Sequence, residues 1–414
     1  MTEQAKLRME EKIKRTDTAS NLGVPDRIPF APLTGYYPAY AYGISYYDIM
    51  MDPRNAIPGV KQYIADIDPD LALAPFAYNI PACEISGATF IKWPGPEFGI
   101  PNHASFQVLD NTYLQDDEYE EFLRDPTHFQ ITKLLPRRHS ALKGFEKIDF
   151  RMTTEFGAFE NFAVMAQPDV KASIMAAIAA GEQYNLYNAR TGEVIAAILE
   201  EGVPPLVDFL SLAPYDIFSD DIRGLTKTLT DMYERPEQLD EALEYMTQVA
   251  IDRFVPIAAA IKPKRVFIPL HAGVDEFMSP ENYERFYWKG LKKLMLALIE
   301  VGSKPMPFCE GNYNTRLEII SDVPKGKVEY MFEKVDIAKL KATVGKVACI
   351  HGNFPNALLI EGTAEQVVEH TKRMIDILGP DGGFIMGCGI GLDNAKKENM
   401  LAWREATEKF GTYH

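Results

Sequence analysis

The sequence predicts an α/β protein of the (β/α)8 TIM barrel class, folded as one domain over residues 1–414. From about residue 167, short apolar segments alternate with longer helical segments. Strands separated by helices need crossover connections, so they form a parallel sheet. A chain of 414 residues has the length of one barrel with additions, and its apolar content of 46% is ordinary for a protein with a large core.

Two additions to the barrel are predicted. Residues 1–24 form an N-terminal helical extension that ends near Gly23, since glycine readily takes the left-handed conformation of a helix cap. Residues from about 92 to 150 are rich in loop-forming residues and mixed in character, which indicates an insertion or a lid-like region. Between these additions, the apolar segments 28–33 and 70–75 are predicted strands.

The regular part of the chain supplies the remaining elements. Ser279 is a predicted helix N-cap followed by proline, and Thr363 with Gln366 has the spacing of a capping box. Strands are expected near 265–271, 305–312, 328–333, 347–353 and 383–389. Helices are expected over 169–182, 236–260, 313–322, 335–344 and 363–378.

Charge and cysteine content narrow the class of protein. The formal charge of −16 argues against nucleic acid or an anionic membrane as the main partner. Four cysteines without a CxxC pair suit a reducing compartment. The N-terminus is charged and has no secretory signal pattern, and no apolar stretch is long enough to span a bilayer. We therefore expect a cytoplasmic protein.

Four potential metal ligands stand at the ends of predicted strands. They are Glu310, Glu333, His351 and Cys388. The carboxyl ends of barrel strands meet at one rim, where active sites are built. Carboxylate, imidazole and thiolate are ligands that a catalytic zinc accepts, and a thiolate disfavours magnesium. The pattern predicts a zinc site. The alternative is a carboxylate–imidazole acid/base site without metal, because each residue alone is more often structural.

Further site residues are expected around these ligands. His271 ends the 265–271 strand at the same rim and could donate a proton, so with Glu310 and His351 it is an expected catalytic residue. Asn312 and Asn353 follow ligand positions and could orient them. In the tyrosine-rich segment after the first strand, Tyr36, Tyr37 and Tyr40 could line an aromatic substrate pocket, or they could simply pack in a half-buried loop.

Several motifs spread along most of the chain carry a family resemblance, which is densest from about residue 265. They are Ile350 to Pro355, Met386 to Ile390, Ala395 to Met400, Phe277 to Glu281 with Phe286 to Trp288, and Val24 to Pro29. Together they resemble the uroporphyrinogen decarboxylase superfamily. The resemblance implies a (β/α)8 barrel, and either a decarboxylase or a zinc methyltransferase that works with a corrinoid protein.

Departures from the family patterns separate these branches. The decarboxylases bind substrate propionates with N-terminal arginines, whereas this chain has tyrosines there and no arginine between Arg27 and Arg54. The methyltransferase branch places a His-x-Cys pair where Phe308 and Glu310 stand here. Glu333 and Cys388 match that branch, and His351 is expected to restore a nitrogen ligand. A carboxylate-rich site leaves zinc a stronger Lewis acid, suited to an ether oxygen.

The resemblance thus implies O-demethylation. A methyl group would pass from a methoxylated aromatic (a phenyl methyl ether) to the cobalt of a separate corrinoid protein. The sequence has no cobalamin-binding motif of its own. Methanol and methylated amines stay open as donors, and a homodimer is possible. One alternative is a metal-independent decarboxylase using Arg27, Arg223 or Arg265. Another is a non-catalytic barrel that only binds a corrinoid protein.

Overall fold

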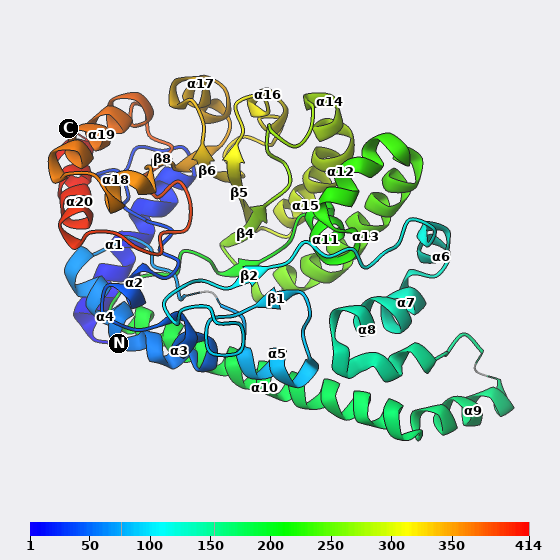
Figure 1. Ribbon diagram of the computed structural model, residues 1–414. Coiled ribbons are helices and arrows are strands. Elements are labelled where there is room, and N and C mark those ends of the chain that lie inside the picture. The colour runs from blue at the N-terminus through cyan, green and yellow to red at the C-terminus, as the bar shows by residue number, and fades with distance from the viewer. Residues whose placement is uncertain (76, 153, 414) are drawn as a thin grey trace.

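A parallel six-stranded sheet forms the centre of the computed structural model, which describes residues 1–75, 77–152 and 154–413. The strands follow one another in chain order, and each is hydrogen-bonded to the next (Figure 1). The predicted alternation of strand and helix is therefore confirmed over this part. The strands are β3 (Phe209–Leu210), β4 (Arg265–Leu270), β5 (Lys304–Asn312), β6 (Glu329–Lys334), β7 (Cys349–Gly352) and β8 (Phe384–Ile385).

Two N-terminal segments complete the ring of strands. Phe30 forms a parallel bridge with Met386, just after β8, and Ala72 forms one with Pro205, just before β3. The Asp70 amide donates to the Phe30 carbonyl at 2.7 Å, which joins the two segments to each other. Eight extended segments thus surround one axis, as the predicted (β/α)8 barrel requires.

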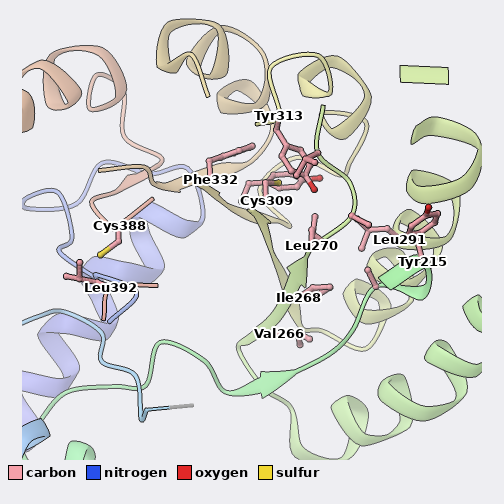
Figure 2. Close-up of a cluster of buried hydrophobic side chains, with 14 of the residues drawn as sticks. Tyr215, Val266, Ile268, Leu270, Leu291, Cys309, Tyr313, Phe332, Cys388 and Leu392 are labelled. Atoms are coloured by element: carbon pink, nitrogen blue, oxygen red, sulfur yellow. The ribbon is translucent and has the colours of Figure 1, made fainter. Parts of the chain in front are cut away.

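Alternate residues of the strands divide between two apolar clusters. Met306 and Phe308 of β5 lie in the cluster that fills the barrel, whereas Cys309 packs outward with the helices. Figure 2 shows the outward side chains of β4, with Leu291 and Tyr215 beside them. Cys309 is a buried free cysteine. The interior cluster comprises Ala19, Ala31, Leu33, Leu71, Leu206, Met306, Phe308, Met331, Cys349 and Ile385.

Helices cover the outside of the ring. The Thr363–Gln366 capping box is present at the start of α19, and the Ser279 side chain caps α14 (Pro280–Asn282). The N-terminal helix is also confirmed, but its left-handed cap residue is Leu22, with φ of 65°, and not Gly23. A tight turn against Thr18 sets this geometry. The main covering helices are α13 (Pro236–Ile261), α15 (Lys289–Glu300), α19 (Ala364–Leu378) and α20 (Lys397–Gly411). Helix α1 (Glu3–Ser20) instead ends at the barrel interior, where Ala19 joins the interior cluster and Ser20 binds Glu329 at the start of β6.

The predicted insertion contains regular elements. A short hairpin of β1 (Ile91–Lys92) and β2 (Gln107–Val108) begins it, and three short α-helices, α6 (Tyr119–Arg124), α7 (Pro126–Phe129) and α8 (Leu135–Arg138), lie in its second half. The π-helix η2 (Gln130–Leu134) separates α7 from α8, and the 3-10 helix η3 (Ser140–Lys147) follows α8.

A long helix follows this region. Helix α10 (Pro168–Glu200) has 33 residues and is much longer than the predicted 169–182 helix. It projects beyond the body of the molecule, with α9 (Glu155–Met165) at its outer end (Figure 1). Among the described helices, none has both the length and the apolar composition needed to cross a membrane.

Candidate active site

His271 lies at the centre of a cluster of ionisable groups at the carboxyl ends of the strands. It directly follows β4, and its side chain is 44% exposed. Its Nδ1 atom lies 2.6 Å from Oδ2 of Asp220, and its Nε2 atom lies 3.9 Å from Oε1 of Glu310. The imidazole is therefore held on one side by a carboxylate and faces a second carboxylate on the other. This arrangement is typical of an oriented acid or base.

Asp216 fixes the backbone on which His271 stands. It lies in α11 (Pro214–Phe218) and is almost fully buried. Its carboxylate accepts hydrogen bonds from the amides of His271 and Ala272, at 3.0 and 3.2 Å, and from the Tyr287 hydroxyl at 2.7 Å. Burial raises the pKa of Asp216 to about 6, although the nearby His271 lowers it. Asp216 thus positions the residue that follows β4.

The neighbouring carboxylates control the protonation of His271. Burial lowers the pKa of His271, but the hydrogen bond that Nδ1–H donates to Asp220 and the charges of Asp216 and Glu310 outweigh it and raise the pKa to about 10. Burial raises the pKa of Glu310 to about 7, with the repulsion of Asp216 and Glu333 adding to it and the attraction of His271 opposing it. The carboxylates therefore favour the protonated imidazole at neutral pH, and Glu310 holds a proton more readily than an ordinary glutamate does.

Glu310 and Glu333 stand on neighbouring strands. Glu310 lies near the end of β5, and Glu333 near the end of β6. Oε2 of Glu333 accepts a hydrogen bond from the amide of Gly311 at 2.6 Å, next to Glu310 in the chain. Gly311 has a positive φ of 82°, which suits glycine at this irregular point of the β5–β6 pairing. The two carboxylates share the rim with His271.

His351 lies inside the barrel and not at the rim, unlike the expectation. Strand pairing aligns it with Met331 and Ile385, so it stands in an interior layer two residues below Glu333. It is fully buried. Its Nε2 atom lies 2.7 Å from the Ala31 carbonyl oxygen, and its Nδ1 atom lies 3.1 Å from Oε1 of Glu329. Both ring nitrogens are therefore engaged by protein acceptors.

Cys388 lies in the apolar core. It is fully buried and bridges to Phe354, and burial raises the pKa of its thiol well above the ordinary value. Figure 2 shows it beside Leu392, away from Leu270 at the end of β4. Among the residues that the structure describes, no three His, Cys, Asp or Glu side chains are grouped to hold a metal ion. The predicted zinc ligands do not fit one ion in this arrangement.

A cavity of about 310 Å³ opens beside His271. Its volume is that of a small ligand site. The walls are mostly apolar and include two aromatic side chains, and the polar lining is largely acidic. The predicted insertion contributes to the wall, as do α11 and the end of β4. The lining residues are Tyr78, Phe90, Val108, Leu109, Asp110, Arg138, Leu212, Asp216, Ile217, Asp220, Asp221, Leu225, Pro269 and His271.

The Uroporphyrinogen decarboxylase (URO-D) family matches residues 158–410, more than half of the chain. The chain belongs to this family. Among solved structures, the chain is similar to a methyltransferase from Methanosarcina mazei, with a TM-score of 0.62 and 16% sequence identity. That alignment covers 96% of this chain and 98% of the other, so the fold extends over nearly the whole length. A search of curated proteins finds no match.

In this URO-D protein, the tyrosines that were expected to line a substrate pocket do not line the cavity beside His271. Tyr36 and Tyr37 are buried in the core, and the Tyr36 ring stacks on Tyr46 with centroids 3.8 Å apart. Tyr40 is 43% exposed. The described cavity lining includes none of these three. Packing, the other interpretation of this segment, accounts for Tyr36 and Tyr37.

The two asparagines lie close to the rim carboxylates. The Asn353 amide group lies 3.5 Å from the Glu333 carbonyl oxygen, and the Asn312 side chain contacts Glu276 and Asn314. In these contacts, neither asparagine side chain binds the carboxylate of Glu310 or Glu333.

Sequence reasoning missed Asp216, Asp220 and Arg138. Asp216 and Asp220 are four residues apart after Pro214, and this i, i+4 spacing on one helical face was an available signal. Their meeting with His271, more than fifty residues later, depends on strand β4 pairing with β3. Arg138 comes from the insertion, and no local pattern in the sequence distinguishes it from other arginines.

We expect Asp220→Asn to lower the pKa of His271 from about 10, because the substitution removes the carboxylate that accepts from Nδ1. Histidine ring signals followed by NMR across a pH titration measure this shift. Asp240→Asn, which removes an exposed carboxylate paired with Arg285, is the matched control. An unchanged titration of His271 would show that Asp220 does not set its protonation.

Proposed function

We propose that this URO-D protein is a methyltransferase that moves a methyl group from a methoxylated aromatic to the cobalt of a separate corrinoid protein. The observation that carries the proposal is the position of His271, whose imidazole lies at the wall of a mostly apolar cavity with carboxylates on both sides that favour its protonated form. A phenyl methyl ether needs an apolar space for its ring and a proton donor at its oxygen. The cavity offers both. The similarity in fold to a methyltransferase agrees with this assignment.

In the proposed step, His271 is the acid that protonates the departing ether oxygen. The bond between the methyl carbon and the ether oxygen breaks as the methyl carbon bonds to cobalt(I), which supplies the electron pair. The pair from the broken bond stays on the oxygen. The oxygen takes the proton from the His271 imidazolium, and a phenol leaves. Stabilising the departing oxygen in this way lowers the barrier where charge develops.

Neighbouring residues prepare the proton for transfer. Asp220 orients the imidazole through Nδ1 and stabilises its positive charge, and Asp216 fixes the backbone below it. Glu310 faces the Nε2 side, and its pKa of about 7 lets it carry a proton at neutral pH. Glu310 is therefore suited to return a proton to His271 after each turnover.

Zinc has no step in this proposal. Glu310 and Glu333 adjoin at the rim, but His351 is engaged by Glu329 and Ala31 inside the barrel, and Cys388 is a buried thiol. The set of four that the sequence indicated is therefore not used, and acid chemistry at His271 takes the place of a Lewis acid.

The contacts of the arginines disfavour a decarboxylase. Arg27 pairs with Asp70, Arg223 with Asp231, and Arg265 with Glu329, each away from the cavity. Arg138 does line the cavity, but it is paired with Asp221 at 2.8 Å. A substrate carboxylate would therefore meet more negative than positive charge. The geometry gives no support to recognition of a polycarboxylate.

The direct test combines the purified protein with cobalamin chemically reduced to cobalt(I) and a set of methoxybenzenes. We expect methylation of cobalt, followed by its absorbance change, and release of the phenol. Because four aspartates and one paired arginine line the cavity, neutral or amino-substituted rings should react roughly tenfold faster than carboxylated rings. Activity should persist with a chelator.

Each part of this test can fail separately. If no ether is demethylated, with free cobalamin or with corrinoid proteins, the proposal is overturned. If a chelator abolishes the reaction and zinc restores it, the assignment of the acid to His271 alone is overturned.

A further inference from the structure

The projecting helices α9 and α10 expose an unusual amount of apolar surface. We call residues 155–186, which comprise α9 and the first half of α10, the helical arm. In α9, Gly157 is the one buried residue, whereas Phe156, Phe159 and Phe162 are 81%, 72% and 58% exposed. The arm extends outward from the body in Figure 1. Three largely exposed phenylalanines on one short helix indicate a surface that another molecule covers.

Helix α10 carries a stripe of exposed residues, apolar at its centre, on the face opposite its attachment. Val170, Ser173 and Tyr187 are buried and hold the helix to the body. The Ser173 hydroxyl, for example, accepts from the Gly144 amide and donates to the Ala141 carbonyl. At 3.6 residues per turn, the outward stripe is spaced by four, three, four and four residues. Its members are Lys171, Met175, Ile178, Glu182 and Leu186.

This stripe is complementary to itself in the antiparallel direction. The midpoint between Lys171 and Glu182 is also the midpoint between Met175 and Ile178. Two copies packed about a two-fold axis at that point place Lys171 of each beside Glu182 of the other. Met175 of each then meets Ile178 of the other. Lys171 and Glu182 are exposed, and neither forms an ion pair within the described part of the chain.

The exposed area agrees with a dimer. An aromatic side chain carries about 150–250 Å² of surface, so the three phenylalanines of α9 expose roughly 400 Å². Met175, Ile178 and Leu186, which are 54%, 50% and 42% exposed, add a somewhat smaller amount. A stable interface covers about 800 Å² on each partner. The arm alone approaches this value.

We infer that the helical arm is a homodimer interface, in which the α10 helices of two copies pack antiparallel about a point between Met175 and Ile178. The interface is isologous, so each contact occurs twice. The small side chains Ala172 and Ala179 flank the stripe and allow the helices to approach closely. The phenylalanines of α9 cover the partner further from the axis. This inference does not depend on the proposed reaction.

The test measures the mass of the full-length protein by light scattering and its dimer dissociation by analytical ultracentrifugation. The unmodified protein should be a dimer at micromolar concentration. Lys171→Glu and Glu182→Lys should each weaken the dimer about tenfold, because each turns two attractive pairs into two repulsive ones. The double variant Lys171→Glu/Glu182→Lys should restore it. Lys346→Glu, an exposed site outside the arm, is the charge control.

Two results would overturn the inference. One is a monomer at all concentrations, which leaves the arm for a different protein. The other is a dimer that neither single substitution weakens, which places the contact elsewhere. Ile178→Asp gives a second check, since it puts a charge at the centre of the stripe and should also weaken the dimer. Circular dichroism shows whether each of these variants keeps its fold.

Discussion

Replacing His271 by glutamine is expected to lower kcat for demethylation by about 10²–10⁴-fold, the usual contribution of a positioned acid. Glutamine keeps a polar group near Asp220 but cannot deliver a proton to the departing oxygen. Because the apolar walls of the cavity are unchanged, KM for the ether should change little. The measurement is steady-state cobalt methylation by the variant and the unmodified protein.

The leaving group provides a control that a structural role for His271 would not affect. A nitro-substituted anisole releases a stable phenolate, which needs less protonation. The His271→Gln variant should therefore lose much less rate with this ether than with an unsubstituted one. An equal loss with both ethers would show that His271 does not act as the acid. The pH profile gives a second readout, since activity should fall as pH rises toward about 10, where His271 loses its proton.

Replacing Glu329 by glutamine is expected to reduce the free energy of unfolding by about 3–5 kcal/mol, because it breaks a buried ion pair and leaves its partner uncompensated. Glu329 is fully buried at the start of β6. Its carboxylate accepts from the Ser20 hydroxyl at 2.8 Å and pairs with Arg265 at 3.3 Å and with His351 at 3.1 Å. Urea denaturation of the two proteins at pH 7 measures the difference.

The pH dependence of this effect has a defined sign. Burial raises the pKa of Glu329, but Arg265 and His351 outweigh it, so the folded-state pKa lies below the ordinary value of 4.5. A lowered carboxylate pKa stabilises the fold above the unfolded-state value, and the stabilisation is lost as pH falls below it. The difference between the proteins should therefore shrink in acid.

The control for Glu329→Gln removes a carboxylate that is open to solvent. Glu3→Gln breaks the exposed pair with Lys6 and should cost less than about 0.5 kcal/mol. A loss of less than about 1 kcal/mol for Glu329→Gln would contradict a stabilising role of the buried network.

The barrel and part of its rim were predictable because the spacing of apolar residues and the order of strands and helices along the chain determine them. Alternating strands and helices indicated a parallel ring, and His271, Glu310 and Glu333 reached the rim because they end strands. The depth of His351 was not predictable. Its level depends on the stagger between strands, which aligns it with Met331 and not with Glu333. Sequence position alone carries no information on that stagger.

The residues that line the cavity were not predictable from the sequence either. Arg138 and Asp110 reach the cavity from the insertion, and Asp220 reaches His271 from the π-helix Ser219–Arg223 that follows α11. Each contact joins segments far apart in the chain, so no local motif marks it. The tyrosine-rich segment gave a local signal in the sequence that did not correspond to the cavity. Its composition suggested a pocket, but its rings mostly fill the core.

The two bridges that complete the ring have a consequence for biosynthesis. Phe30 leaves the ribosome early, yet its neighbour Met386 is made more than 350 residues later. Ser20 and Ala31 likewise wait for Glu329 and His351, which are 309 and 320 residues away. Contacts of such long range form slowly, and exposed strand edges aggregate. The nascent chain should therefore depend on chaperones during translation, more than a protein of equal size whose first and last strands stay apart.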